Sequence, residues 1–450
     1  MRGKNFWRRL QPLLSFYLAQ LRRRQRWAFP LGLLGLSMLI GQWSPSLGIL
    51  AFLLLMGFFF RYYLTTLWRF GWWVRKFVPF SFPQLDLLVA PELTDATDWQ
   101  MVAKQCEEAL SELQRFFGFP LQRRLTLFVF PTMAEVNRLF QTVAGARALP
   151  HGDAILLAWD GWQAAKFPQE ILRHELAHLF SCRLGVDAPA FKREGLATWL
   201  QGREEGKPID FFALAEILSG NDRPLLWILR DAHFFTDSPA SYFFAGSFTG
   251  FLMERFGWEA YRRFYAAADE RNFEQTFERH FGMDLLAAER AWKQLLIARR
   301  SEFEPELSLA VRRKRVETTY NAWQFWLCIE EAEALLRDGE QDWRVIWYAS
   351  AAHSAVGNYL RALELLQVLS ERDEATLRPY RANLWLQIGR LYDLLGEREK
   401  AITAYQQALK EPDYWDEEDG STHALARRFL QQPFTEQQVR ERWRKRLRLR

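Results

Sequence analysis

The first 85 residues contain no aspartate or glutamate. Twelve lysines and arginines lie in the same stretch, so it carries a formal charge of +12 while the whole chain carries +5. The remaining residues therefore sum to −7, and the basic character of the protein comes from one terminal segment. That distribution does not indicate a nucleic-acid-binding face, so nucleic acid is excluded as a partner.

Cysteine is scarce as well. The 450 residues contain three cysteines, an odd number at scattered positions: Cys106, Cys182 and Cys328. Small secreted proteins that depend on disulfides have even numbers of closely spaced cysteines. The sequence therefore excludes a disulfide framework as the main source of stability.

Two runs near the N-terminus lack charge altogether. Residues 28–43 and 47–60 are apolar and are separated by Ser44-Pro-Ser46, which predicts a transmembrane helical hairpin over 28–68. Each run is shorter than the roughly 20 residues that span a bilayer, so the second helix would continue past Arg61, whose charge can reach the interface. A shallow re-entrant hairpin is the alternative.

Basic residues flank both ends of this predicted hairpin, and the turn between the runs has none. The positive-inside rule then places both ends in the cytoplasm. We expect a protein of the inner (plasma) membrane with the lipid bilayer as a partner, a basic segment at 1–27, a linker at 69–85 and a cytoplasmic catalytic domain. If the first run does not span, that domain faces outward. The basic tail at 433–450 could lie on anionic lipid or form a solvated helix end.

Histidine is also rare, with seven in the chain, yet two of them stand in the run His174-Glu-Leu-Ala-His178. Residues four apart share one face of a helix, so both imidazoles can bind one metal ion, while Glu175 projects about 100° away and can reach a metal-bound water. Pro168 suits the first turn of such a helix and Gly185 its C-terminal cap. The alternative is a buried helix whose histidines satisfy each other.

Glu194 is the predicted third ligand. Catalytic zinc usually takes three protein ligands and leaves one position for water, and Cys182 lies too near the end of the first helix. A second helix from Phe191 could carry Glu194 past His178, and the small Gly195 would let that helix approach the first closely. The alternative is a solvated surface carboxylate.

Further stretches accompany these motifs along the chain. In order they are Leu125-Thr-Leu-Phe-Val-Phe130, His151-Gly-Asp-Ala-Ile-Leu-Leu157, Tyr242-Phe-Phe-Ala-Gly-Ser-Phe248 and Phe281-Gly-Met-Asp284, with Trp292 after them. With the histidine helix and Glu194-Gly-Leu-Ala, the run from Leu87 to Trp292 resembles the gluzincin-type peptidases, and within them the bacterial peptidase MA-like metallohydrolases. The resemblance implies an α+β zincin-like domain over 86–300, with a core strand at 125–130 and an edge strand over the cleft at 151–157.

The same resemblance implies roles for individual residues. His174, His178 and Glu194 would hold Zn²⁺, Glu175 would be the general base, and a peptide or protein substrate would lie along the edge strand. Zinc lowers the pKa of its bound water toward neutrality, and Glu175 would accept the proton as that water attacks a peptide carbonyl.

Tyr242 is the candidate donor to the oxyanion of the tetrahedral intermediate. Its alternative role is packing in an aromatic cluster with Phe243 and Phe244. His151 and His233 are further possible donors, although a lone loop histidine is more often just solvated.

Thr198 departs from the pattern of the resembled family. Many gluzincins place an acid four residues after the glutamate ligand, where it orients a ligand imidazole. A threonine at that position would hold the ring less firmly, so we expect reduced activity but retained metal binding.

The residues after Trp292 predict helices only. One group falls on the tetratricopeptide template: Trp385, Ile388, Gly389, Tyr392, Gly396, Ala401, Tyr405, Ala408 and Pro412. An earlier copy aligns Ser350, Gly357 and Ala362 with Gly389, Gly396 and Ala401, a period of 39 residues. With flanking helices at 321–336 and 422–430, we expect an all-α repeat domain over 316–432. Its concave surface could bind a peptide or partner protein, or it could buttress the first domain.

The sequence therefore predicts a membrane-anchored zinc peptidase with three parts: a transmembrane hairpin, an α+β zincin-like domain and an all-α tetratricopeptide-like domain. The alternative is a membrane scaffold of low or no activity that binds partners through its repeats. A scaffold has no need of a base between two metal ligands, so the presence of Glu175 favours the enzyme. An aminopeptidase is a third possibility.

Overall fold

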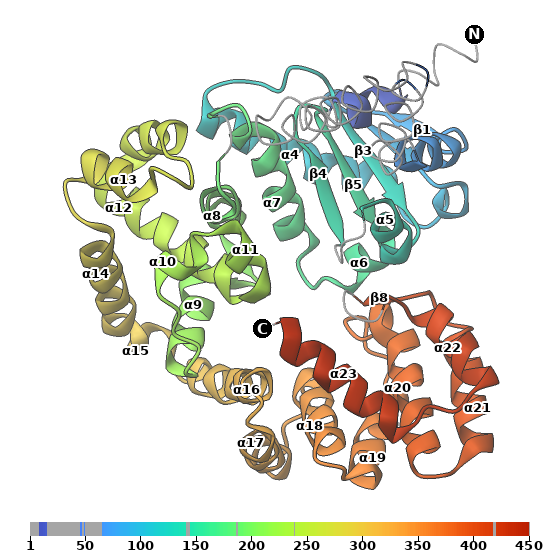
Figure 1. Ribbon diagram of the computed structural model, residues 1–450. Coiled ribbons are helices and arrows are strands. Elements are labelled where there is room, and N and C mark those ends of the chain that lie inside the picture. Colours follow the sequence, from blue (N-terminus) through green and yellow to red (C-terminus); the bar gives the residue numbers. More distant parts are fainter. Residues whose placement is uncertain are drawn as a thin grey trace.

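The computed structural model describes residues 9–15, 46, 49, 65–140, 145–185, 188–237, 239–416 and 420–449. These residues form many helices and one small mixed sheet (Figure 1). A sheet-bearing part comes first, a group of helices packs beside it, and a series of helix pairs then leads back toward the sheet (Figure 1). The series returns to the sheet-bearing part, where the short helix η3 (Arg378–Tyr380) contacts helix α6 (Trp159–Ala164).

The main sheet has five strands in the order β1-β2-β3-β5-β4. Their bounds are β1 (Val78–Ser81), β2 (Leu85–Val89), β3 (Leu125–Phe130), β4 (Ala146–Leu149) and β5 (Ala154–Ala158). The three central strands β2, β3 and β5 run parallel, and the two edge strands pair antiparallel with their neighbours. Parallel strands are usually buried on both faces, in agreement with the sequences of these three strands, which are apolar apart from Asp86 and Thr126.

Alternate residues of each strand enter different cores, because successive side chains of a strand point to opposite faces. Leu125, Leu127 and Val129 of β3 pack toward helices α4 (Trp99–Phe117) and α7 (Pro168–Ser181). On the opposite face, Phe128 and Phe130 belong to a separate core. The sheet therefore separates two apolar layers, and α7 lies on the side of the first.

The second layer is formed by segments near the N-terminus. A helix at 65–74 buries Phe70 and Val74 against the sheet, and the ring of Phe70 meets that of Phe128 edge to face at 5.0 Å. The helical segment 9–15 joins the same core, and Arg9 donates hydrogen bonds to the carbonyls of Val74 and Phe77. Residues 69–85, predicted as a linker, thus contain the end of a packed helix and strand β1.

The predicted fold class needs a correction at its membrane hairpin. Within the described residues, none of the helices has both the length and the apolar character required to cross a bilayer. The two apolar runs contain 16 and 14 residues, fewer than the roughly 20 that a span requires. Residues 28–64 lie outside the described part of the chain, apart from Ser46 and Ile49. The transmembrane hairpin is therefore not supported, nor is the inner-membrane location deduced from it.

The predicted edge strand also needs a correction. Residues 154–158 form β5, which lies between β3 and β4 and is buried throughout. The edge strand beside α7 is β4 instead, and 150–153 form the turn between the two. The five successive apolar residues of β5 are typical of an interior strand, which accounts for the difference.

The second group of helices packs around α8 (Ala190–Gln201) and the long helix α12 (Ala240–Ala267). Trp292 is buried in this core, and its indole N–H donates to the hydroxyl of Ser247 at 2.9 Å. The other elements up to residue 303 are η1 (Pro91–Leu93), α5 (Met133–Phe140), β6 (Arg203–Glu204), β7 (Lys207–Pro208), α9 (Ile209–Leu218), α10 (Leu225–Ile228), α11 (Asp231–Phe234), η2 (Phe235–Asp237), α13 (Phe273–Phe281), α14 (Leu285–Ala298) and α15 (Arg300–Phe303).

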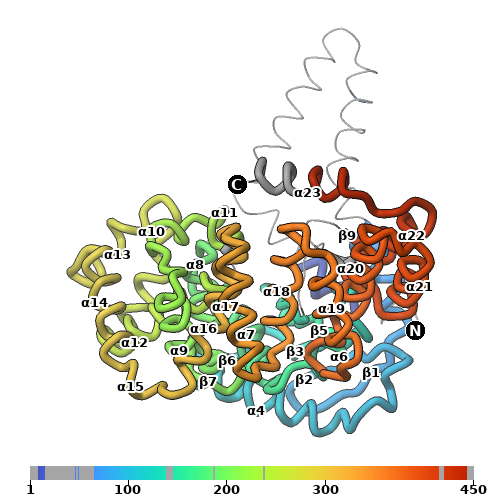
Figure 2. The backbone as a smooth tube through the Cα atoms, turned by 90° about the horizontal axis from the view of Figure 1, so that it is seen from below, coloured from blue at the N-terminus to red at the C-terminus, as the bar shows by residue number. Residues whose placement is uncertain are grey.

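Helix pairs make up the rest of the chain, and seen from below they lie side by side in front of the sheet-bearing part (Figure 2). They are α16 (Glu306–Asn321), α17 (Phe325–Arg337), α18 (Trp343–Ala355), α19 (Tyr359–Ser370), α20 (Arg381–Leu394), α21 (Arg398–Ala408) and α22 (Thr422–Gln431), followed by α23 (Glu436–Leu449); the two-residue strands β8 (Trp415–Asp416) and β9 (Gly420–Ser421) precede α22. Gly357 and Gly396, with φ of 84° and 79°, stand between the members of two pairs.

Positions 39 residues apart have matching places in these two pairs. Ser350 of α18 donates from its hydroxyl to the carbonyl of Ala362 at 2.8 Å, and Gly389 of α20 packs directly against the ring of Tyr405. A side chain at Gly389 would displace that ring.

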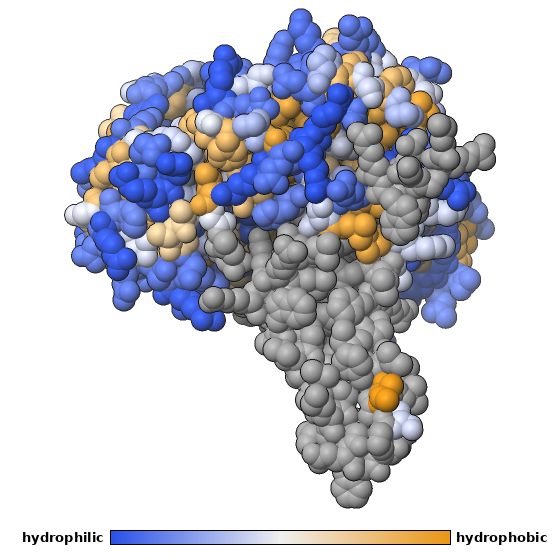
Figure 3. Space-filling view, turned by 90° about the horizontal axis from the view of Figure 1, so that it is seen from above, coloured by the Kyte–Doolittle hydropathy of each residue, from blue (hydrophilic) through white to orange (hydrophobic). Residues whose placement is uncertain are grey.

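From above, the described surface is largely hydrophilic, with apolar side chains in separate patches (Figure 3).

Candidate metal centre

Helix α7 carries His174, Glu175 and His178. It starts with Pro168 in its first turn and buries Leu176 in the core that also contains Leu127 of β3. The helix ends at Ser181, earlier than expected from Gly185. Gly185 instead lies against the backbone of Ala266, where a Cβ would be 3.0 Å from the Cα of that residue. The glycine serves a close approach of two chain segments, and the predicted cap at this position is wrong.

Two imidazoles and one carboxylate converge beside α7. Nε2 of His174 and Nε2 of His178 are 3.2 Å apart, and Oε2 of Glu194 lies 3.4 Å from the first and 3.1 Å from the second. Within the described part of the chain, this is the group of three possible ligands whose atoms all lie within 4.8 Å of one another. A tetrahedral zinc site with bonds of about 2.0–2.1 Å has ligand atoms about 3.3 Å apart. The three side chains therefore fit one zinc ion in both type and spacing.

The carboxylate of Glu194 is buried, with 7% of the residue exposed. Burial by itself raises its pKa, but the charge of His178 and hydrogen bonds from both imidazoles outweigh burial and hold the pKa well below its usual value. Arg193 adds a hydrogen bond from Nε to Oε1 at 3.0 Å. Burial lowers the pKa of His174, but its hydrogen bond to Glu194 and the charge of Glu175 raise it by more. The net result is a pKa above the usual value for histidine. The site therefore keeps negative charge available for a cation.

Helix α8 brings Glu194 to this position. The neighbouring Gly195 faces α12, where a Cβ would lie 2.8 Å from the carbonyl oxygen of Ala245 and 2.9 Å from Oγ1 of Thr249. The sequence predicted that this small residue would admit α7. It admits α12 instead, because α8 is packed between those two helices.

Glu175 points to the edge of the sheet. Its Oε2 accepts a hydrogen bond from the backbone N–H of Ala148 on β4 at 2.5 Å. The charge of Glu175 also acts on His174. The carboxylate of Glu175 is thus held at the edge strand, near enough to His174 for its charge to act on that ring, and is a candidate proton acceptor.

Tyr242 lies beside the same group. It belongs to the first turn of α12, which begins at Ala240. Its ring centroid is 6.2 Å from that of His174 and 5.1 Å from that of Phe234. Burial, followed by the charge of Glu194, raises the pKa of the Tyr242 phenol, so it is protonated and can donate at neutral pH.

The aromatic cluster considered for Tyr242 takes a different form. Phe243 stacks on Phe212 at 4.9 Å, and Phe244 packs against Trp292 at 6.0 Å. Phe243 and Phe244 thus pack against other aromatic residues, while the ring of Tyr242 lies beside His174.

His233, which lies in α11, and His151, which lies in a turn, are both outside the cluster. His233 stacks on the indole of Trp227 at 4.6 Å, and its Nδ1 is 3.1 Å from the carbonyl of Trp227. His151 is an exposed residue with φ of 67° in the turn after β4. Neither residue is among the converging ligands.

Gln201 is a residue that the sequence analysis missed. Its Oε1 lies 3.1 Å from Nδ1 of His174. The expected partner, Thr198, has a buried hydroxyl without a hydrogen-bond partner among the described residues, and its methyl group packs against Gly246. Gln201 stands seven residues after Glu194, which places both on one face of α8. Helical periodicity could have identified this second position.

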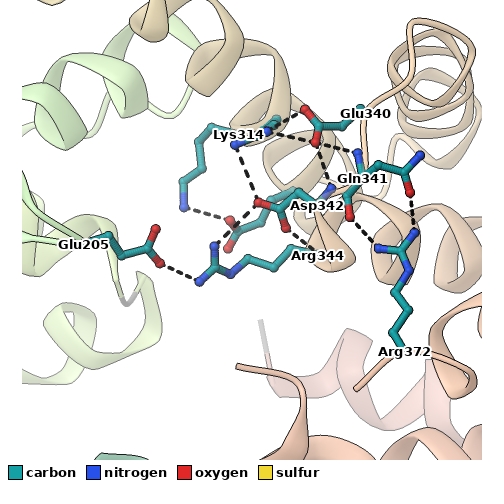
Figure 4. Close-up of polar contacts among 9 residues, drawn as sticks. Glu205, Lys314, Glu340, Gln341, Asp342, Arg344 and Arg372 are labelled. Atoms are coloured by element: carbon teal, nitrogen blue, oxygen red, sulfur yellow. Dashed lines mark hydrogen bonds and ion pairs between the residues drawn. The ribbon is translucent and has the colours of Figure 1, made fainter. Parts of the chain in front are cut away.

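A cavity of about 940 Å³ lies between the sheet-bearing part and the helix pairs. Figure 4 shows Arg344 of α18 reaching across to Glu205 in the turn between β6 and β7, with an ion pair of 2.6 Å. The lining includes Glu170 and Ile171 of α7, in the turn before His174, and aromatic residues of α18 such as Trp343. The metal-site residues themselves do not line it, so the cavity borders the histidine helix and not the ligands.

Neither the models of known protein families nor the curated proteins contain a match to this chain. The resemblance to gluzincin peptidases and that to tetratricopeptide repeats therefore rest on the motifs of this sequence alone.

Proposed function

We propose that the protein is a zinc-dependent peptidase of the gluzincin type, with His174, His178 and Glu194 as the metal ligands. The observation that carries the proposal is the convergence of these three side chains with mutual distances of 3.1–3.4 Å. Two neutral nitrogen donors and one carboxylate are a donor set of catalytic zinc sites, which leave one position free.

Zinc at such a site would supply a Lewis acid that polarises a carbonyl and makes water a better nucleophile. Glu175 is the group that would accept the proton of the attacking water, since its carboxylate lies next to His174 at the sheet edge. Tyr242 would donate to the developing oxyanion, because its ring lies beside His174 and its phenol stays protonated. The substrate would be a peptide or protein.

A second candidate function is a scaffold that binds partner proteins through its helix pairs and has little or no turnover. Two observations favour it. Thr198 makes no hydrogen bond to a ligand imidazole, and Nδ1 of His178 is buried without a partner among the described residues. Catalytic zinc sites usually orient each histidine through its second nitrogen.

The test uses the full chain with zinc and an unfolded substrate such as reduced casein. We expect cleavage by the wild type and none by Glu175→Gln, with one zinc bound in both. Glu170→Gln is the matched control on the same helix, since Glu170 accepts from the N–H of Gly206 and an amide oxygen can still do so. It should cleave normally. Zinc binding without cleavage by the wild type would favour the scaffold, and a wild type that binds no zinc would overturn the enzyme proposal.

A further inference from the structure

Among the described residues, Gln201 is the one whose side chain hydrogen-bonds the Nδ1 nitrogen of His174 or His178. It ends α8 and is 8% exposed. Its side-chain oxygen is 3.1 Å from Nδ1 of His174. A glutamine amide can present either an acceptor or a donor to a ring nitrogen, and only its other contacts decide which.

The amide nitrogen of Gln201 has two such contacts. It lies 2.8 Å from the backbone carbonyl of Arg203, and it also contacts Oε2 of Glu204. A carbonyl can only accept, and a carboxylate accepts as well, so the NH₂ group must face these two oxygens. The amide oxygen is then turned to His174 and accepts a hydrogen bond from Nδ1–H. With a proton held on Nδ1, Nε2 is the nitrogen left for a metal, which would replace the hydrogen bond from Nε2 to Glu194.

The hairpin β6–β7 contacts both Gln201 and helix α7. Arg203 and Glu204 form β6 and pair with β7. The N–H of Gly206 at its turn donates to Glu170 at 3.1 Å. Glu170 stands four residues before His174 on α7, so the hairpin contacts one face of that helix directly and, through Gln201, at the ligand.

We propose that Gln201 is a positioning residue that keeps a proton on Nδ1 of His174, so that Nε2 is the nitrogen left for zinc, and that the hairpin β6–β7 fixes Gln201 in turn. The part that concerns zinc rests on the proposed function. The proton on Nδ1 can be measured without metal.

The first experiment compares Gln201→Leu with Thr198→Val, which alters the position where the resembled family carries its orienting acid. Zinc affinity is measured by competition with a chromophoric chelator. Loss of an outer-sphere partner weakens metal binding by roughly 10–100-fold, and we expect this for Gln201→Leu, against less than about twofold for Thr198→Val. Equal affinities of Gln201→Leu and wild type would overturn the proposal.

The second experiment records the ¹⁵N shifts of the His174 ring in the zinc-free protein. In the wild type and in Thr198→Val, Nδ1 should carry a proton that is protected from exchange with solvent, and in Gln201→Leu that proton should be lost or exchange faster. A wild-type ring protonated on Nε2 alone would overturn the proposal. Because no metal is present, this result is independent of whether the wild type is a zinc enzyme.

A double variant separates hydrogen bonding from a general loss of structure. Gln201→Glu alone places two carboxylates against each other, and should weaken zinc binding. Adding Glu204→Gln puts a donor in place of one of the two acceptors that face the new carboxylate, while the carbonyl of Arg203 remains, and the carboxylate still accepts from Nδ1–H. We expect the double variant to bind zinc at least about tenfold more tightly than Gln201→Glu. No recovery in a variant that folds like the wild type by circular dichroism would contradict the proposed pairing.

Discussion

Oε2 of Glu194 lies 3.1 Å from Nε2 of His178, although the two residues belong to different helices. The contact exists because α7 and α8 both bury apolar side chains in one core, which brings a carboxylate of one helix against an imidazole of the other. A buried carboxylate is stable only with charged or hydrogen-bonding partners, and two imidazoles and Arg193 provide them.

The carboxylate of Glu194 should determine metal affinity. In Glu194→Gln the ligand oxygen becomes neutral, and we expect zinc affinity to fall by more than the roughly 100-fold that marks the loss of an outer-sphere contact. Chelator competition measures the dissociation constant. Glu170→Gln should retain the wild-type value, and an unchanged constant in Glu194→Gln would contradict the assignment of this ligand.

The phenol of Tyr242 should affect turnover and not metal binding. Removal of one oxyanion donor slows an enzyme by about 10²–10³-fold, and we expect a loss at the lower end of this range for Tyr242→Phe. Zinc affinity should not change, because the ring still packs against His174. Tyr261→Phe in the same helix is the control and should cleave like the wild type. Full activity of Tyr242→Phe would leave this tyrosine a packing role only.

Asp160 should produce a pH-dependent loss of stability. Its Oδ1 accepts from the N–H groups of Met133 and Gly161, at 2.8 and 2.7 Å, and burial raises its pKa from 3.8 to about 6. As the pH rises from about 4 to 6, the unfolded chain releases this proton first, so the contribution of Asp160 to the free energy of unfolding falls. Above pH 6 it stays constant.

Asp160→Asn keeps the acceptor and removes the titration. The stability of this variant relative to the wild type should therefore rise by roughly 2–3 kcal/mol between pH 4 and 6. Urea denaturation at several pH values measures the difference. A difference that does not vary with pH would contradict the raised pKa.

Gly195 should be intolerant of a side chain. In Gly195→Ala the new methyl group would meet the carbonyl oxygen of Ala245, which belongs to the backbone and cannot turn away. We expect a loss of about 1–3 kcal/mol, the usual effect of overpacking, together with weaker zinc binding because Glu194 moves with α8. Thermal unfolding of the zinc-free protein measures the first effect. The control is Gly145→Ala, whose Cβ would have its nearest contact at 3.9 Å, and a similar loss there would exclude overpacking as the cause.

The helical pattern around His174 was readable from the sequence, because the contacts concerned span four residues of one helix. The helix pairs were also readable from the sequence. Ser350 and Gly389 are separated by the length of one repeat, and each lies where two helices meet. The strand at 125–130, which the family resemblance implied, is β3.

Other predictions failed where a residue's neighbour is distant in the sequence. The sequence of an apolar run does not show whether the run faces lipid or packs on a sheet. The first residues of the helix at 65–74 were assigned to the hairpin, but this helix packs on β3 through Phe70. Nor does a buried strand reveal its order in the sheet, so β5 was taken for the edge.

By itself, then, the sequence determined that His174 and His178 share one face of a helix, since the α-helical period decides which side chains point together. Only the tertiary structure decided that Glu194 completes this face, that Gly195 admits α12, and that Gln201 rather than Thr198 supports His174. These contacts depend on the distance and angle at which helices and strands pack, and such quantities arise from the whole core and not from local spacing.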